Sequence, residues 1–447
     1  MASTILEKFV GDNITYELLV LIWLLWSWEF YLSLRQTKLM NKLVDVPHEL
    51  KDLITNEVYS KARLYAIDRS NFSNVQSLFS TFITTGTILF FVFRYFWDSA
   101  VRLSTACGIS KDNEILISGT CMLLMNILST IIDLPFSVYN TFWLEEKHGF
   151  NKQTVGFFIK DKIKKFIVLQ VIVIPLICGV IWIVQIGGDY FFVYLWVFTG
   201  IVTLFMLILY PEVIAPLFDK YSPLPEGELR TKIEELASSL GFPLYKLYIV
   251  EGSKRSSHSN AYLYGFHKHK RIVLFDTLVK EYYKPDDKDA DRDKGCETDE
   301  VVAVLAHELG HWKYNHTLKG LVLSQVNILL NFVMFAKLLN YQPMYTAFGF
   351  TDSQPIFIGL IIVMMFILIP INTLMGFVSI VISRKFEFEA DNFAKTLGYT
   401  TPLISALVKL HKDNLGFPVF DKLYSGWHHS HPPLLERLEA LKEKKIN

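Results

Sequence analysis

The amino-acid sequence predicts a mainly α-helical, polytopic membrane protein that also carries a soluble region with a small β-sheet. The first observation is composition: 51% of the 447 residues are hydrophobic and 15% are aromatic, and the mean hydropathy is +0.30. These values are too apolar for an ordinary soluble protein of this length. The second observation is that the apolar residues gather in seven long runs. The formal net charge is +0, which provides no basic field for nucleic acid.

Each apolar run approaches or exceeds the ~20 residues that a helix needs to cross about 30 Å of hydrocarbon. A large soluble protein with buried helices is the alternative, and seven such runs in one chain argue against it. The seven predicted transmembrane helices cover residues 16–34, 77–97, 115–139, 166–187, 189–213, 318–340 and 355–382.

Basic residues between the spans predict their orientation, because cytoplasmic loops carry an excess of Lys and Arg. The loop after the first span is rich in both and the loop after the third span holds six Lys, whereas the opposite side carries only Lys8, Arg102 and Lys111. We therefore expect a lumenal N-terminus and a cytosolic C-terminus. The final residues, Lys444-Lys445-Ile446-Asn447, resemble a dilysine retrieval signal, with a solvated helix end as the alternative. This signal favours the endoplasmic reticulum membrane, with the inner nuclear membrane as a second location.

Two polar segments, 214–317 and 383–447, fall on the same, cytosolic side of this predicted array. The first has helical periodicity at 226–240, followed by three predicted strands at 245–251, 260–265 and 271–275. A charged run at 283–297 breaks this pattern, and we expect it to be a mobile loop. The chain therefore divides into helices one to five (1–213), a catalytic insertion (214–317), helices six and seven (318–382), and a C-terminal catalytic segment and tail (383–447).

The insertion ends in the stretch TDEVVAVLAHELGHWKYNH at 298–316, which is typical of a helix with Thr298 as its N-cap. It contains His307-Glu308-Leu309-Gly310-His311. Residues four apart share one helix face, so two imidazoles can bind one Zn²⁺ while Glu308 acts as a general base toward water. A pattern with only three specified residues occurs by chance in about a few per cent of chains this long. The motif alone therefore does not decide between a zinc site and a plain helix.

A catalytic zinc needs a third protein ligand. Glu387 follows the seventh predicted span and is our candidate, which gives one Zn²⁺ per chain bound by His307, His311 and Glu387. Asp391 is four residues further on, so it faces the same way and can accept the other N–H of His307. Glu389 points to another side and is the weaker candidate. The alternative is a charged helix face in water, but pairing with the histidine motif on the same membrane side favours the ligands.

Taken together, these residues resemble the integral-membrane (type I) CAAX prenyl proteases, which are zinc metalloproteases with seven transmembrane helices around a large internal chamber. The polar residues Asn126 and Asp133 within the spans are compatible with a wet interior or with hydrogen bonds between helices. The resemblance covers most of the chain and is carried by DLPFS at 133–137, Thr141-Phe142, EEKHGFNK at 145–152, HELGHW at 307–312, SRKFEFEAD at 383–391 and SHPP at 430–433.

The resemblance implies removal of the C-terminal -aaX tripeptide from prenylated CAAX proteins or peptides at a lipid bilayer, with a second upstream cut in some precursors. It implies that His431 stabilises the anionic intermediate and that Arg437 helps to hold the site, although Arg437 also suits a plain helix. It implies that substrate pairs with an edge strand, and the matching residues are Asn260, Ala261, Tyr262 and Leu263. A plain surface hairpin is the alternative for that strand.

Two other functions compete with this interpretation. One is a broader membrane-protein quality-control protease with the same zinc chemistry. The other is a transporter or scaffold with a vestigial metal site. The complete ligand set, together with Glu308 and His431, argues against the second.

Overall fold

The computed structural model describes residues 2–254, 258, 260–265, 270–283 and 294–442. Two predictions lie outside these residues. One is the dilysine signal at 444–447. The other is the mobile loop predicted at 283–297, most of which is not among the described residues.

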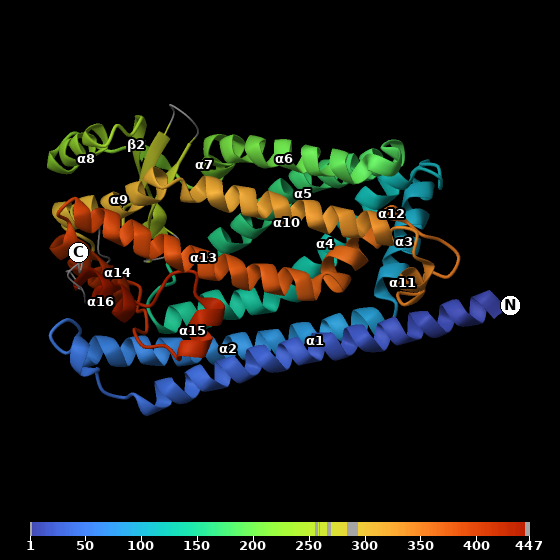
Figure 1. Cartoon of the computed structure of the whole chain (residues 1–447), viewed down its shortest axis with the longest axis horizontal. Coiled ribbons are helices and arrows are strands. Elements are labelled where there is room, and N and C mark those ends of the chain that lie inside the picture. Colours follow the sequence, from blue (N-terminus) through green and yellow to red (C-terminus); the bar gives the residue numbers. More distant parts are fainter. Residues whose placement is uncertain (1, 255–257, 259, 266–269, 284–293, 443–447) are drawn as a thin grey trace.

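Long helices run side by side along the longest axis of the molecule (Figure 1). Among the described residues, five helices are long and apolar enough to cross a membrane, and the number rises to seven if each of two bent helix pairs is one span. This confirms the expected polytopic, mainly α-helical class. The spans are α1 (Ala2–Lys42), α2 (Asn56–Leu89) with α3 (Val92–Ala106), α4 (Glu114–Tyr139) continued by the π-helix η2 (Asn140–Glu145), α5 (Val155–Ile186), α6 (Phe191–Leu209), α10 (His316–Leu338), and α12 (Ile356–Ile362) with α13 (Ile369–Thr396).

The bent pairs differ from the straight spans that we expected. Helices α2 and α3 meet at 67°, and the break falls inside the predicted span 77–97. Its cause is Phe91, which adopts the left-handed conformation with φ 51° and so cannot continue a right-handed helix. Helices α12 and α13 meet at 57°. There Pro370 opens α13, where its missing N–H and fixed φ favour a helix start over a continuous helix.

The soluble region is built on a four-stranded sheet with the order β1-β2-β4-β3. Strand β2 pairs parallel with β4, and β3 pairs antiparallel with β4, so that β3 is an edge strand. Three strands match the predicted ones within two residues, whereas β1 has only three residues and leaves no periodic signal. The strands are β1 (Tyr221–Pro223), β2 (Leu244–Val250), β3 (Ala261–Tyr264) and β4 (Lys270–Phe275).

The sheet and its helices occupy one end of the molecule, opposite the start of α1 (Figure 1). Leu236, Ile272, Leu305, Phe393 and Leu403 belong to one buried cluster that joins four helices to the sheet. The helices of this end are α8 (Glu228–Ser239), α9 (Thr298–Lys313), α14 (Thr400–Asp413), α15 (Lys422–His428) and α16 (Leu434–Lys442). The short helix α7 (Ala215–Phe218) lies between α6 and the sheet, and α11 (Gln342–Thr346) lies at the other end of the molecule.

A large cavity of about 1310 Å³ lies among the membrane helices. It is lined mainly by α2, α4, α12 and the π-helix η6 (Val363–Ile367) that follows α12. Its surface is mostly apolar, but Asn126 and Asp133 are part of the lining. The Asn126 amide also donates to Gln170 on α5 at 3.0 Å. Asn126 therefore makes the hydrogen bond between helices that the sequence allowed, and it also borders an internal space.

Helix α13 connects the membrane array to the soluble end, because its last turns pack closely on α9. Gly310 of α9 makes this approach possible. A Cβ atom at Gly310 would lie 3.0 Å from the Cα of Ala390 and 3.1 Å from the Cβ of Phe393. The absence of a side chain at Gly310 therefore sets the spacing of the two helices.

We expect Gly310→Ala to destabilise the protein by about 1–3 kcal/mol, because the added methyl group meets backbone atoms that cannot move away easily. Thermal unfolding of the solubilised protein measures this change. Gly320→Ala is the matched control, since a Cβ there meets no heavy atom within 4 Å. A melting temperature that falls equally in both variants would contradict the explanation.

Candidate metal centre

Helix α9 is held at its start by a reciprocal pair of hydrogen bonds. Glu297 is the N-cap, and its backbone N–H donates to Glu300 at 2.7 Å in a capping box. Our prediction of Thr298 as the cap was therefore wrong by one residue, because the longer Glu297 side chain fills that role. Glu300 also accepts from Lys409 of α14 at 2.8 Å. These contacts fix α9 against its neighbours before the histidine motif begins.

The structure brings His307 and His311 of α9 together with Glu387 of α13. The two Nε2 atoms are 3.2 Å apart, and the Glu387 oxygens lie 3.3 Å from His311 Nε2 and 3.5 Å from His307 Nε2. Tetrahedral zinc with bonds of about 2.0–2.1 Å requires ligand atoms about 3.3 Å apart. The three residues therefore fit a single metal ion of this kind.

A buried polar atom provides an independent sign of the same fit. Glu387 is 5% exposed, and its Oε2 has no hydrogen-bond partner among the described residues. Burying a carboxylate oxygen without a partner is costly. A metal ion between the imidazoles and this carboxylate would remove that cost.

Three helices meet at Asp391, which lies one turn after Glu387. Asp391 Oδ1 is 2.8 Å from His307 Nδ1, and Arg437 of α16 donates to its two oxygens at 2.6 and 2.8 Å. Asp391 thus contacts the ring nitrogen of His307 that faces away from Glu387. This contact favours the His307 tautomer that leaves Nε2 free to bind a metal.

A second outer pair supports His311, and the sequence reasoning missed it. His316 Nδ1 lies 3.0 Å from His311 Nδ1, and His316 Nε2 lies 2.9 Å from Glu389. Asn315, with φ 55°, ends α9 and turns His316 back toward the motif. A third histidine five residues after His311 was the available signal, but a simple helix would have pointed it away.

The other expected site residues surround a cavity of about 230 Å³ beside these ligands. Glu308, His431 and Asn260 line it, and His431 Nε2 lies 3.3 Å from Glu387 Oε1. Ala261 also lines the cavity, whereas Tyr262 and Leu263 are not part of the described lining. Only the first part of the predicted substrate strand therefore borders the ligands.

The charges at the centre shift the pKa values of two ligands in opposite senses. Burial disfavours the imidazolium of His307, but the neighbouring carboxylates of Asp391 and Glu387 outweigh burial and raise its pKa to about 9. Burial raises the pKa of Glu387, which lies beyond the predicted membrane span, but the neighbouring imidazoles of His307 and His311 hold it well below its usual range. Without metal, the pair is therefore an imidazolium beside a carboxylate.

Comparison with known proteins places most of the chain in two adjoining families. Residues 36–220 match the family described as CAAX prenyl protease N-terminal, five membrane helices, and residues 223–445 match peptidase family M48. The CAAX prenyl protease 1 homolog of Homo sapiens is 48% identical over 96% of this chain and 95% of its own length. Its namesake in Arabidopsis thaliana is 45% identical over 99% and 98%.

A solved structure shows the same fold. The crystal structure of S. mikatae Ste24p has a TM-score of 0.83 and 36% sequence identity, and the match covers 97% of this chain and 98% of that one. The resemblance stated from the sequence motifs is thereby confirmed along nearly the whole chain.

Metal affinity should depend on pH, because metal must displace the proton of His307 below its pKa of about 9. Glu387 stays ionised through this range and adds no dependence. We expect the apparent affinity for Zn²⁺ to rise about tenfold per pH unit up to that pKa and then to level off. Competition with a chromogenic chelator measures it, and an affinity that does not change from about pH 6 to about pH 8 would contradict a protonated His307.

Loss of the Asp391 charge should weaken the metal site through His307. We expect Asp391→Asn to lower metal affinity about 10–100-fold, the usual effect of removing a carboxylate that orients a metal-binding histidine. The control is Asp421→Asn. Asp421 forms an ion pair with Arg35 at 2.8 Å and lies outside the metal centre. Equal metal affinities for the two variants would mean that Asp391 has no such effect.

Proposed function

The chain belongs to the CAAX prenyl protease family of M48 metalloproteases, membrane enzymes that process prenylated CAAX proteins, and we propose how its residues perform this activity. His307, His311 and Glu387 bind one Zn²⁺. The observation that carries this proposal is that the Nε2 atoms of His307 and His311 lie 3.2 Å apart, while Glu387 places one oxygen 3.3 Å from His311 Nε2 and the other 3.5 Å from His307 Nε2. When bound, zinc polarises the scissile carbonyl and makes water easier to deprotonate.

Glu308 is the general base in this proposal. It follows His307 directly and lines the same cavity, so its carboxylate can reach water placed between the metal ligands and a peptide carbonyl. It removes a proton from the attacking water and then delivers that proton to the leaving amine. This delivery is needed because an amide nitrogen leaves as a neutral amine.

His431 donates a hydrogen bond to the anionic tetrahedral intermediate. Its side chain is 71% exposed, and its Nε2 lies near a ligand carboxylate. A donor that faces the developing charge contributes about 10²–10³ in turnover. Arg437 also lines this cavity, but it donates to both oxygens of Asp391, so in this scheme it acts as a positioning residue for His307.

The peptide part of the substrate adds as a strand to β3. Strand β3 pairs with β4 on one side and ends the sheet, so the backbone of its other edge is available to an extended peptide. Asn260 and Ala261 bring this edge into the cavity of the metal ligands. Tyr262 and Leu263 continue the same strand and bind residues further from the cleaved bond. Release of the -aaX tripeptide is the expected outcome.

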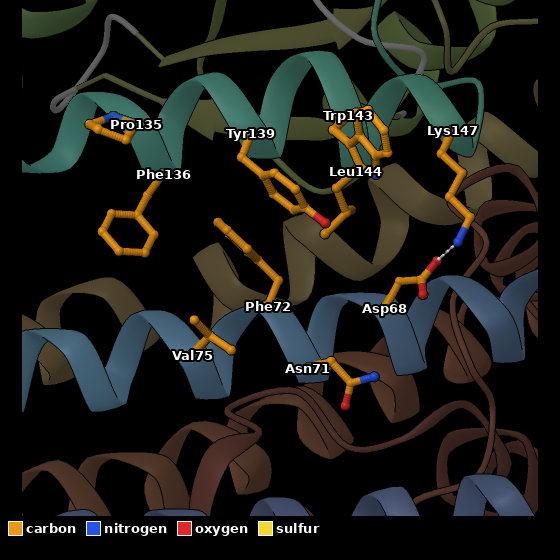
Figure 2. Close-up of a pocket in the computed structure, with 10 residues that line it drawn as sticks. All are labelled: Asp68, Asn71, Phe72, Val75, Pro135, Phe136, Tyr139, Trp143, Leu144 and Lys147. Carbon is orange, nitrogen blue, oxygen red and sulfur yellow. Dashed lines mark hydrogen bonds and ion pairs between the residues drawn. The ribbon is translucent and has the colours of Figure 1, made fainter.

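The prenyl chain needs an apolar environment, since each buried CH₂ contributes about 0.8 kcal/mol. The cavity among the membrane helices is one such environment. Figure 2 shows a second, a groove of about 580 Å³ in which Phe72 and Val75 of α2 face Phe136 and Tyr139 of α4. An ion pair between Asp68 and Lys147 at 2.6 Å closes one end of this groove.

The basic loops between the spans support a cytosolic metal centre and a lumenal N-terminus in the endoplasmic reticulum membrane, with the inner nuclear membrane as a second location. In this orientation, prenylated proteins would reach the site from the cytosol and from the bilayer. The metal centre and the start of α1 lie at opposite ends of the long axis, as a membrane-spanning arrangement requires (Figure 1).

The test is hydrolysis of a farnesylated CAAX peptide, followed by mass spectrometry of the products. We expect the wild-type enzyme to release the last three residues and Glu308→Gln to lose about 10²–10⁴ in turnover while keeping its metal. Glu439→Gln, at an exposed position on α16, is the control with unchanged turnover. Full activity in a metal-loaded Glu308→Gln enzyme would remove Glu308 from the mechanism.

A further inference from the structure

A second small cavity, which we call the Arg69 cavity, lies near the metal centre and has no part in the chemistry above. Its volume is about 210 Å³, and Arg69, Asn140, Thr141, Glu145 and His258 are among the residues that line it. Most of these groups are hydrogen-bond donors, and one is a permanent cation. The cavity is therefore suited to an anionic ligand that accepts several hydrogen bonds.

The donors of this cavity are available to a ligand. Within the described part of the chain, no carboxylate lies within 4 Å of the Arg69 guanidinium, which instead covers the ring of Tyr65 at 5.4 Å. The side chains of Asn140 and Thr141 likewise form no hydrogen bond to another described residue. Glu145, the acid of the cavity, accepts from Tyr65 at 2.8 Å and lies 3.7 Å from His258 Nε2, and Arg69 acts on it only through its charge at longer range.

The backbone at this cavity departs from a regular α-helix, as it also does in two other described segments, Tyr210–Ile214 and Val363–Ile367. Asn140, Thr141 and Glu145 lie on the π-helix η2, which directly extends α4. Single π-turns inside α-helices are rare and are frequent at functional sites. Here the wider turn presents those three residues to the Arg69 cavity, while Trp143 and Leu144 line the apolar groove on the other side (Figure 2).

His258 connects this cavity to the metal centre. It lines the Arg69 cavity, and its Nδ1 lies 3.2 Å from Asn414, which lines the cavity of the metal ligands together with Glu308. His258 also lies just before the start of β3 in the chain. The Arg69 cavity is therefore next to the amino end of the strand that we assign to substrate.

The direction of peptide pairing then decides which part of the substrate reaches Arg69. Antiparallel pairs outnumber parallel ones roughly two- to threefold, and a peptide antiparallel to β3 points its carboxyl end toward the amino end of the strand. A CAAX chain ends three residues beyond the cleaved bond, and three extended residues span about 10 Å. The last group of such a peptide is a free carboxylate.

We propose that Arg69, together with Asn140 and Thr141, binds the free C-terminal carboxylate of the CAAX substrate. Arg–carboxylate pairs are among the strongest hydrogen-bonded contacts in proteins because the guanidinium can donate two parallel bonds. Binding at this point fixes the distance between the end of the chain and the metal, and so sets release at three residues. This inference rests on the proposed function, specifically on peptide pairing along β3.

The experiment compares one farnesylated CAAX peptide in two forms, the free acid and the C-terminal carboxamide, with the purified full-length enzyme. We expect the wild-type kcat/KM to favour the acid about ten- to a hundredfold, the effect of hydrogen bonds to a charged group. In Arg69→Gln the acid-to-amide ratio should fall close to one. Asn140→Asp keeps the side-chain size but adds a negative charge, so it should lower the ratio as well.

Arg102→Gln is the matched control and should keep the wild-type ratio, because Arg102 is an exposed residue of α3 that contacts Ser99. The ratio is measured within each variant, so a smaller folded fraction cancels from it. A wild-type ratio of one, or an unchanged ratio in Arg69→Gln, would overturn the carboxylate site and leave the proposed function standing. Failure of the wild-type enzyme to release a tripeptide from either peptide would overturn the proposed function, and this inference with it.

Discussion

The buried carboxylate of Asp391 is the contact on which the metal centre depends. It is 2% exposed, and it joins His307 of α9 to Arg437 of α16 from its own position on α13. Because α13 continues out of the membrane array, this group helps to fix the soluble helices relative to the spans, together with the close approach of α9 to α13 at Gly310. Buried polar networks of this kind stabilise one arrangement when every member is paired, and become costly when one partner is lost. The geometry of the ligands therefore depends on the folding of the whole array.

The sequence was sufficient to predict those parts of the structure that depend on the spacing of nearby residues or on the length of a segment. The four-residue spacing of His307 and His311 requires one helix face, and the long apolar runs require membrane helices. It was insufficient for those parts that depend on the backbone conformation of single residues or on contacts between residues far apart in the chain. Phe91 takes a left-handed conformation that glycine or asparagine usually adopts, so nothing marked the bend at that position. Glu389 was correctly placed on another side from the ligands, but its partner His316 becomes visible only when the turn at Asn315 is known.

Helix α4 and its π-turn place an apolar environment next to a polar one. One side of this segment borders the groove with Phe72 (Figure 2), and the other borders the Arg69 cavity. A lipidated peptide has the same division, since a hydrocarbon chain and a charged terminus are separated by only a few residues. In the proposed scheme, one rigid element therefore recognises both features of the substrate, and the side chains between them need not be read.

The shortness of β3 has a consequence for the order in which products leave. Four residues, Ala261–Tyr264, offer few backbone hydrogen bonds to a peptide, so the proposed strand pairing would by itself hold substrate weakly. A substrate whose lipid lies in the bilayer does not need tight pairing, because tethering raises its effective concentration beside the strand. Cleavage cuts the tripeptide from this tether, and it then dissociates as a free solute. The lipidated product stays in the membrane and departs by lateral diffusion. One product therefore leaves through water and the other through the lipid bilayer.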